Sequence, residues 1–408
     1  LLLVSMPMSA LAATWDIGKG DITVNAESGG QTVRQGGGAA VPDSAPVITG
    51  TSKENNVTIN AESGQTASVT LSGVNIDVRD KGKAAVSTTG EGNVSIELNG
   101  AWIARQALTP GRNRVCAFRG MTPGTPKHVR LLNDVQPMQQ DPTHFLQLNA
   151  VEYAGGEFLP LPEPRCRLEF VGDSITSGEG TLGARQEEDW IGAFFSAENH
   201  YARLTSDALG AEYRLVSQSG WGIVCGWDND PHHTLPPYYE QVCGVAEGAR
   251  NTALGAKQQN DFSAWQPNAV IVNLATNDEH AFCNPAWLDP VTGKAYKLRT
   301  LPDGSYHPED VRRLQDAVCD FLTILRERNP RAVLVWSYGM LGSGLQEVLQ
   351  GAVQQYGSRS GDTRAFYLPL PDTTADTVGS RQHPGVLSHR AAAEVLTAFL
   401  KHKLEEQA

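Results

Sequence analysis

From Arg165 onward, short apolar runs alternate with helical segments, and this alternation restricts the possible folds more than any other feature of the sequence. The run at 269–275 is almost continuously apolar, as expected of a parallel strand that is buried on both faces. Five strands are predicted in all, at 168–172, 213–217, 269–275, 332–337 and 365–368, with helices at 194–209, 308–328 and 386–404. Strands separated by helices in this way predict an α/β domain with a doubly wound parallel sheet.

The first hundred residues have a different composition. Between Asp16 and Ala101 there is no Phe, Tyr, Trp, Cys or His. Residues 21–29 read DITVNAESG and return 35 positions later at 56–64 as NVTINAESG, and a weaker echo, NVSIELNG, follows at 93–100. Alternating apolar and polar residues that end in turn residues predict strands, and repeats of this length often build stacked β structures. Residues 14–100 therefore predict a repetitive β segment that resembles carbohydrate-binding modules of gut bacteria. A flexible, Gly-rich spacer is the alternative.

Two further segments complete the predicted organisation. Residues 1–13 combine an apolar start with the small residues ALAA, a pattern typical of the tail of a secretory signal peptide. We therefore expect a protein that is secreted from, or held at the surface of, a bacterial cell. Residues 101–162 contain a Pro-Gly turn and strand-like runs at 129–131 and 145–151, which predict part of a small β-sandwich. The catalytic domain is expected at 163–408.

Composition and charge argue against several classes of protein. The 33 Lys and Arg residues against 45 Asp and Glu residues give a net charge of −12, whereas nucleic-acid binding needs a basic face. No apolar run is long enough to predict a membrane span. None of the six cysteines forms a C-x-x-C pair, so a zinc knuckle is not expected. Cys225 and Cys243 flank one loop and are the best candidates for a disulfide.

Four polar blocks lie near predicted strand ends. Gly172-Asp173-Ser174-Ile175 follows the first strand, Ser219-Gly220 the second and Thr276-Asn277-Asp278 the third, while His383-Pro384 precedes the last helix. Because sites in doubly wound sheets lie at the carboxyl ends of the strands, we expect these blocks to converge.

The four blocks resemble those of the SGNH (GDSL-like) hydrolases over about 240 residues. Within that superfamily, FVGDSITSG at 170–178, SQSGWG at 217–222, the Thr-Asn-Asp triplet and His383-Pro384 are similar to carbohydrate esterase family 2. Members of that family remove acetyl groups from plant polysaccharides and carry a β-sandwich before the hydrolase domain. The resemblance implies a flavodoxin-like five-stranded sheet, an acetylated xylan or glucomannan substrate and no cofactor.

The residue types suit ester hydrolysis. A serine hydroxyl is a weak nucleophile that needs a base, so Ser174 is the candidate nucleophile and His383 the candidate base. The resemblance assigns three oxyanion donors: the backbone N–H groups of Ser174 and Gly220 and the side-chain amide of Asn277. Ser177 is a less favoured nucleophile, because the Gly-Asp-Ser register places Ser174 at the catalytic position.

One departure from the family pattern concerns the group that orients His383. SGNH enzymes usually carry Asp three residues before the histidine, and this position is Ser380 here. A backbone carbonyl takes that role in some family members, and Asp376 or Asp372 could take it instead, so the third role stays open. Trp221, next to the oxyanion glycine, is the first choice for a sugar-stacking platform, with ordinary loop packing as the alternative.

Several alternatives remain for the function. A metal site at Asp228, Asp230, His232 and His233 is disfavoured, because polar loops of this kind are usually solvated. A lipase-type or lysophospholipase-type SGNH esterase would need a long acyl channel. A carbohydrate-binding surface protein with an inactive hydrolase domain would release no acetate. The α/β-hydrolase fold is disfavoured because no G-x-S-x-G motif surrounds Ser174.

Overall fold

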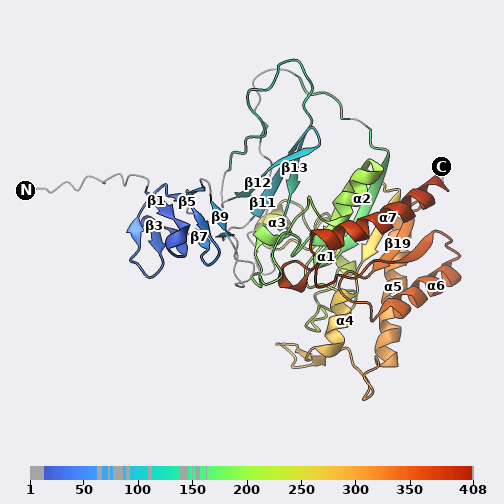
Figure 1. The fold of residues 1–408 in the computed structure, drawn as a ribbon. Coiled ribbons are helices and arrows are strands. Elements are labelled where there is room, and N and C mark those ends of the chain that lie inside the picture. Colours follow the sequence, from blue (N-terminus) through green and yellow to red (C-terminus); the bar gives the residue numbers. More distant parts are fainter. Residues whose placement is uncertain are drawn as a thin grey trace, which may run out of the picture.

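The computed structural model describes residues 13–61, 67–71, 74–76, 86–88, 92–108, 113–137, 146, 148, 150–151, 157–161 and 163–406. Figure 1 shows three parts: N-terminal strands in blue, a small sheet in teal and a larger α/β domain from green to red. The signal peptide predicted at 1–13 lies, apart from Ala13, outside the described residues. Most of the strand predicted at 145–151 lies outside them as well.

The α/β domain is built on five parallel strands, which confirms the five predicted ones. They are β14 (Cys166–Gly172), β15 (Ala211–Ser217), β16 (Ala269–Asn273), β19 (Val333–Tyr338) and β20 (Ala365–Pro369). Their order in the sheet is β15-β14-β16-β19-β20, which is the flavodoxin-like order. In this register Gly172 pairs with Ser217 on one side and with Asn273 on the other. The carboxyl ends of the three strands that precede the polar blocks are therefore level with one another.

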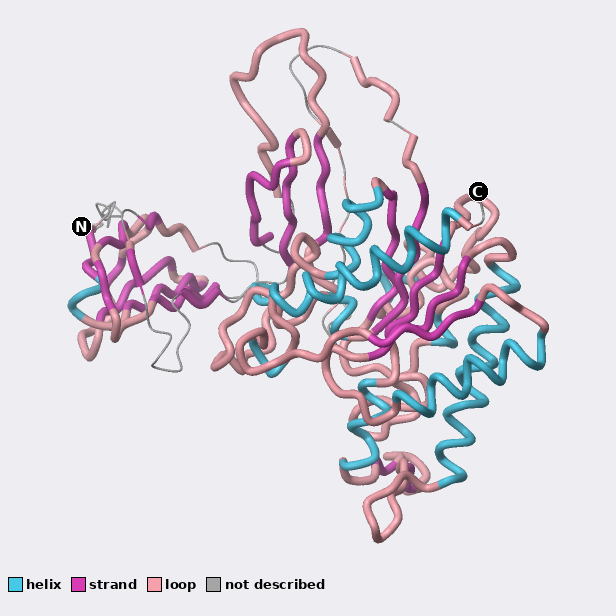
Figure 2. The backbone as a smooth tube through the Cα atoms, turned by 45° about the vertical axis from the view of Figure 1, so that its right-hand side comes forward, coloured by secondary structure: helices cyan, strands magenta, loops and turns pink. Residues whose placement is uncertain are grey.

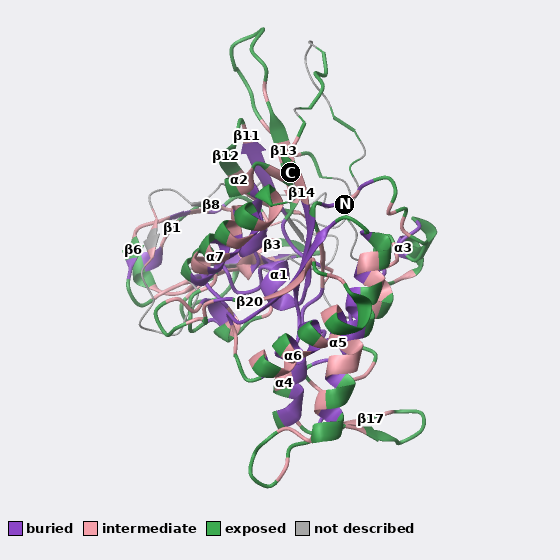
Figure 3. Cartoon of the chain, turned by 90° about the vertical axis from the view of Figure 1, so that its right-hand side faces the viewer, coloured by how far each residue is buried: buried purple, intermediate pink, exposed green. Residues whose placement is uncertain are grey.

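Helices cover both faces of this sheet (Figure 2). On one face α5 (Pro308–Arg328) and α6 (Gln346–Ser360) pack against Val272, Leu334 and Trp336. On the other face α2 (Tyr201–Leu209) and α7 (Val386–Glu405) pack against Phe170, Ile271 and Val335. Figure 3 shows the central strands as the most buried part of the chain. The near-continuous apolar runs in the sequence follow from this burial on two sides.

Two predicted helices show how local capping sets helix ends. Helix α5 has the predicted bounds, with Pro308 in its first turn and the His307 side chain accepting the N–H of Glu309. The helix predicted at 194–209 starts too early. Helix α2 begins at Tyr201, because His200 takes a non-helical conformation and its ring accepts the N–H groups of Ala202 and Arg203. The remaining helical elements are η1 (Ile17–Lys19), α1 (Ser174–Ser177), η3 (Gly192–Phe194), η4 (Pro236–Tyr238), α3 (Ala249–Ala253), α4 (Thr276–Cys283) and η5 (Ser380–Gln382).

The N-terminal strands form a stack of short sheets in which the two copies of the sequence repeat are adjacent parallel rungs, whereas the strands at 30–35 and 41–42 pair antiparallel beside them. Ile22 pairs with Val57 and Asn25 with Asn60, and the Asn60 amide donates to the Asn25 side chain at 2.9 Å. The weaker echo at 93–100 is not a further rung, because it forms part of the next sheet. The strands of the stack are β1 (Thr14–Asp16), β2 (Ile22–Glu27), β3 (Gly30–Gln35), β4 (Val41–Pro42), β5 (Val47–Thr49), β6 (Thr51–Ser52), β7 (Val57–Ala61), β8 (Thr70–Leu71), β9 (Asn75–Ile76) and β10 (Val86–Thr88).

A three-stranded antiparallel sheet follows, in the order β12-β11-β13. Its strands are β11 (Gly92–Leu98), β12 (Ala101–Leu108) and β13 (Val129–Asn133), and a separate short hairpin joins β17 (Trp287–Leu288) to β18 (Ala295–Tyr296). The domain boundary predicted at residue 100 is wrong, because it divides the β11–β12 hairpin. Asn99 and Gly100 both have positive φ, 54° and 81°, as a tight two-residue hairpin turn requires. The change in composition therefore does not coincide with a structural boundary.

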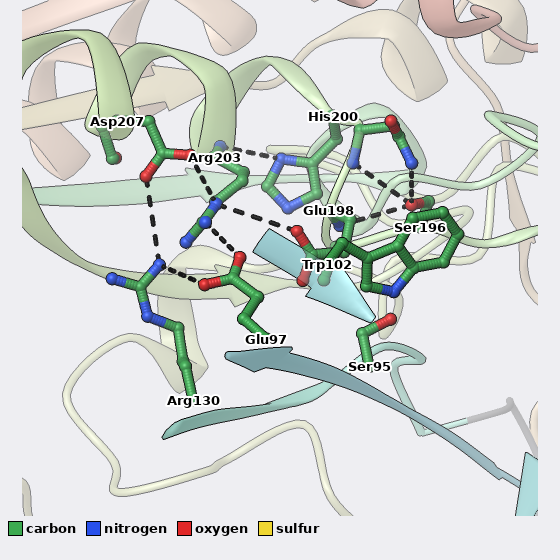
Figure 4. Close-up of polar contacts among 12 residues, drawn as sticks. Ser95, Glu97, Trp102, Arg130, Ser196, Glu198, His200, Arg203 and Asp207 are labelled. Atoms are coloured by element: carbon green, nitrogen blue, oxygen red, sulfur yellow. Dashed lines mark hydrogen bonds and ion pairs between the residues drawn. The ribbon is translucent and has the colours of Figure 1, made fainter. Parts of the chain in front are cut away.

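A cluster of charged side chains around the buried pair Glu97 and Arg203 attaches this sheet to the α/β domain (Figure 4). Glu97 of β11 accepts a hydrogen bond from Arg203 of α2 and lies 3.3 Å from Arg130 of β13. Asp207 lies 2.8 Å from Arg203 and 3.9 Å from Arg130. The pKa of Glu198 is raised to about 8, mainly by burial and further by a hydrogen bond with Glu97 and by the charge of Glu97. A raised pKa favours the protonated form of Glu198, which limits the repulsion among the carboxyl groups of this cluster.

Candidate active site

Ser174 lies at the carboxyl end of β14, at the start of the short helix α1. The Asp173 side chain caps this helix by accepting the N–H of Ile175 at 3.0 Å. Gly172 is required at the preceding position, because a Cβ there would lie 2.0 Å from Thr176 Oγ1 and 2.7 Å from the Asn273 carbonyl oxygen. The first N–H groups of a helix have no partner within it, so the N–H of Ser174 suits the predicted oxyanion role.

The structure brings His383 to Ser174 across 209 positions of sequence. His383 Nε2 lies 2.9 Å from Ser174 Oγ, and His383 Nδ1 lies 2.8 Å from the backbone oxygen of Arg381. A carbonyl oxygen can only accept, so Nδ1 carries the proton and Nε2 is free to accept the proton of Ser174. Arg381 and Gln382 have φ of 52° and 58°, and this left-handed turn carries the Arg381 carbonyl back to the imidazole.

Neither aspartate considered for the third role contacts His383 in the structure. Asp372 accepts the N–H of Gly342 at 3.2 Å, and Asp376 is exposed. Ser380, at the position usual for the aspartate, is buried, and its carbonyl accepts the N–H of His383 at 2.9 Å. Of the groups that the sequence left open for orienting His383, the one in contact with its Nδ1 is a backbone carbonyl, that of Arg381.

The first prediction follows from this contact. Asp372→Asn and Asp376→Asn are each expected to lower kcat for an aryl acetate less than about tenfold, whereas loss of a triad aspartate costs about 10⁴-fold. Ser380→Ala serves as a third variant at the usual aspartate position. A thousandfold loss in either aspartate variant, with its circular dichroism spectrum unchanged, would assign that carboxylate to the histidine and contradict the geometry.

The other two predicted oxyanion groups lie just beyond the ends of β15 and β16, at the same edge of the sheet. Gly220 has φ of 77° and follows Ser219, whose N–H donates to Gln136 Oε1 at 2.8 Å and whose hydroxyl oxygen lies 3.0 Å from the same atom. Asn277, near the start of α4, donates from Nδ2 to the Trp221 carbonyl oxygen at 2.9 Å and to Asp173 Oδ2 at 3.2 Å. Both amide hydrogens of Asn277 therefore have acceptors. We expect a substrate oxyanion to take the place of the more distant acceptor, Asp173 Oδ2.

Two buried carboxyl groups support these loops. Asp278 accepts the N–H groups of Ile223 and Val224, both at 2.8 Å, and so holds the segment that follows Gly220. Burial raises the pKa of Asp278 to about 6 although these hydrogen bonds lower it. Burial also raises the pKa of Asp173 to about 7. Both groups fix backbone around the reacting serine.

The prediction that Trp221 forms an exposed sugar platform is wrong. Its side chain is 6% exposed, because the ring packs against His233 and Tyr238 at centroid distances of 5.7 and 5.0 Å. Trp227, in the same loop, is 50% exposed, and its backbone N–H donates to the Gly220 carbonyl oxygen at 3.2 Å. Trp227 is thus the accessible aromatic residue next to the oxyanion loop.

Other predicted groups have structural contacts. Ser177 Oγ bonds to Ser217 Oγ at 2.9 Å rather than to a histidine. The disulfide considered between Cys225 and Cys243 is not formed, and all six cysteines are free thiols. In the part of the chain that the structure describes, no group of three His, Cys, Asp or Glu side chains is arranged to hold a metal ion. Within the same part, no helix has the length and apolar character needed to cross a bilayer.

Sequence reasoning missed Glu179, Gln136 and Arg381. Glu179 follows the serine motif but has no conspicuous pattern of its own, and Gln136 belongs to the segment after β13. Arg381 acts through its backbone oxygen, which any residue type would provide. The Gly-Glu-Gly run at 178–180 is the one local signal that could have drawn attention to a buried carboxylate.

Two solved structures have folds similar to that of this chain, and the first is also similar in sequence. An acetyl xylan esterase from the rumen bacterium Butyrivibrio proteoclasticus is 46% identical, with a TM-score of 0.73 over 78% of this chain and 86% of that one. A family two carbohydrate esterase from Clostridium thermocellum, solved with cellohexaose, has the same fold at 22% identity, with a TM-score of 0.62 over 78% of this chain and 87% of that one. The chain belongs to carbohydrate esterase family 2.

Curated sequences add relatives of a similar kind. A cellulase/esterase of Acetivibrio thermocellus is 26% identical over 64% of this chain, and an acetylxylan esterase/glucomannan deacetylase of Cellvibrio japonicus is 25% identical over 63%. The chain spans 28% and 63% of the lengths of these two relatives. No protein-family model matches the sequence.

Proposed function

We propose that this family 2 member is a carbohydrate O-acetyl esterase that removes acetyl groups from xylan or glucomannan. The observation that carries the proposal is the 2.9 Å contact between Ser174 Oγ and His383 Nε2, with Nδ1 anchored on a carbonyl. The 46% identity to an acetyl xylan esterase supports the substrate class. The residue pattern at 1–13 supports secretion.

The proposed reaction has two halves. Ser174 Oγ attacks the acetyl carbonyl carbon while His383 Nε2 takes its proton, and the oxyanion meets the N–H groups of Ser174 and Gly220 and the Asn277 amide. The intermediate collapses to an acetyl-enzyme as the imidazolium returns the proton to the departing sugar oxygen. Water then attacks the acetyl carbon while His383 takes its proton. The bond between that carbon and Ser174 Oγ breaks as His383 returns the proton to Oγ, which releases acetic acid and the free serine.

The site suits a sugar substrate. Trp227 offers an exposed ring beside the oxyanion loop, and aromatic faces pack well against sugar rings. The N-terminal strands β1–β10 would supply a second carbohydrate contact, in line with the resemblance of their repeat to carbohydrate-binding modules. The three-stranded sheet, which includes β11 from outside the predicted range, would form one half of the β-sandwich predicted at 101–162.

A release assay tests this function. Purified protein is incubated with acetylated xylan, acetylated glucomannan and acetylated pectin, and free acetate is measured. In parallel, aryl esters with acyl chains of two to twelve carbons are compared. Acetate release with a sharp preference for the acetyl ester supports the proposal. A preference for long acyl chains would favour a lipase-type enzyme, and release of no acid from any ester would favour a binding protein.

A second prediction concerns Trp227. Trp227→Ala is expected to raise KM for acetylated xylan about tenfold and to leave kcat for a small aryl acetate nearly unchanged, because stacked rings contribute about 1 kcal/mol or more. Trp102→Ala is the matched control, because Trp102 is equally exposed, at 49%, but lies on β12. Equal KM values for Trp227→Ala and the unmodified protein would exclude Trp227 as a platform.

A further inference from the structure

We propose that the buried carboxylate of Glu179 is the positioning residue that supplies His383 with the negative charge that Ser380 cannot provide. This inference rests on the proposed serine–histidine mechanism and adds a residue to it. It differs from the aspartate of a usual triad in its place, because Nδ1 of His383 is already occupied by the Arg381 carbonyl.

The position of Glu179 is set by close backbone contacts. Gly178 and Gly180, with φ of 75° and 73°, turn the chain on either side of it. A Cβ on Gly180 would lie 2.5 Å from both the Ser380 carbonyl oxygen and His383 Cβ. The Ser380 N–H also donates to the Gly180 carbonyl oxygen at 3.1 Å. The histidine loop therefore packs directly on the loop that carries Glu179, and neither can move far without the other.

The side chain of Glu179 connects both halves of the site. It is 3% exposed, and its Oε1 lies 2.9 Å from Arg381 Nε and 3.8 Å from His383 Nε2. Ser219, the neighbour of the oxyanion glycine, also hydrogen-bonds to this carboxylate. One carboxylate thus contacts the arginine whose carbonyl sets the histidine tautomer and the serine that precedes Gly220.

Glu179 stays ionised despite its burial. Burial alone raises the pKa of this carboxyl, but the charge of His383, hydrogen bonds from Ser219 and Arg381 and the charge of Arg381 together lower it below its usual range. The other charged or titratable groups near His383 are Arg381, the buried Asp173 and His389. Burial lowers the pKa of His389 well below its usual value. Exposed Glu188 bonds through its side chain to Gln382.

This arrangement stabilises the charged form of the base. When Ser174 gives up its proton, positive charge appears on the imidazole 3.8 Å from the Glu179 carboxylate, between side chains that are 15% and 3% exposed. An opposite charge at that distance favours the charged form. The positive charge of Arg381 disfavours the protonated imidazole. Removal of the Glu179 charge and removal of the Arg381 charge should therefore shift the titration of the base in opposite directions.

The test compares the pH dependence of kcat/KM for an aryl acetate in three variants. Glu179→Gln should lower kcat about tenfold or more and move the midpoint of the acid limb down by about one pH unit. Arg381→Gln keeps a donor for Glu179 but removes the positive charge, so it should move the midpoint up. Glu188→Gln removes a nearby exposed carboxylate and should leave the midpoint in place.

Opposite shifts in the first two variants, with none in the third, support the proposal. Unchanged midpoints, or shifts of the same sign, overturn it, because a merely structural ion pair would affect rate without this pattern. If Glu179→Gln fails to fold, the upward shift expected for Arg381→Gln still decides, since a downward or absent shift contradicts the proposal. Titration of the His383 ring by NMR measures the same shifts without substrate. The inference about Glu179 can therefore fail while the proposed function stands, and the proposed function can fail while the inference stands.

Discussion

Replacement of Ser174 by alanine is expected to lower the turnover of an aryl acetate by at least about 10⁴-fold. The variant removes the hydroxyl that lies 2.9 Å from His383 Nε2, and with it the only atom that can form the acetyl-enzyme in the proposed reaction. The oxyanion donors remain, so a small residual rate above that of water is expected. Aryl-acetate turnover and mass spectrometry for an acetylated serine together provide the measurement.

Ser177→Ala is the matched control for this prediction. Ser177 lies on the same short helix, but its hydroxyl bonds to Ser217, so we expect activity within about threefold of the unmodified protein. Substantial turnover in Ser174→Ala, or an acetyl group recovered on Ser177, would contradict the assignment of the nucleophile.

The parallel sheet and its polar edge could be predicted because both depend on local signals. A strand that is buried on both faces has to be apolar throughout, as 269–275 is, and the residues after such strands are short turns rich in Gly, Asp and Asn. Since the strands are parallel, their carboxyl ends share one edge whatever their order. Ser174, Gly220 and Asn277 could therefore be grouped before the order of the strands was known.

Which backbone carbonyl orients His383 could not be predicted, because it depends on backbone conformation rather than on a side chain. Arg381 and Gln382 take positive φ without being glycine, and no residue pattern marks such a turn. The burial of Trp221 depends likewise on distant partners, His233 and Tyr238. Aromatic residues in loops occur both as exposed platforms and as packing residues, so sequence alone could not show that Trp221 is buried.

The contact between the β11–β13 sheet and the α/β domain could not be predicted from the sequence either. Glu97 and Arg203 lie 106 positions apart, and each on its own resembles an ordinary surface charge. Charged residues are rarely buried unless they are paired, and pairing over such a separation leaves no periodic signal. The abrupt change in composition near residue 100 suggested a boundary there, whereas the contacts of Glu97 connect β11 to the α/β domain.

Arg203→Ala is accordingly expected to destabilise the protein by about 3–5 kcal/mol, the usual effect of breaking a buried ion pair. The side chains of Arg203 and Glu97 are 6% and 4% exposed, so the variant leaves Glu97 buried with only the more distant Arg130 to balance it. Arg359→Ala is the matched control. Its ion pair with Asp316 is 59% and 49% exposed, and such pairs contribute about 0–1 kcal/mol.

Urea unfolding followed by far-UV circular dichroism measures both variants. The double variant Glu97→Gln, Arg203→Met removes both charges, so it should recover much of the stability that Arg203→Ala loses, because the cost of that variant lies in the unpaired carboxylate rather than in a lost attraction. Aryl-acetate turnover of the folded fraction should stay close to normal in all three proteins, since none of these residues touches Ser174 or His383. Equal stability of Arg203→Ala and Arg359→Ala would mean that water reaches the Glu97–Arg203 contact, and the β11–β13 sheet would then need another explanation for its attachment to α2.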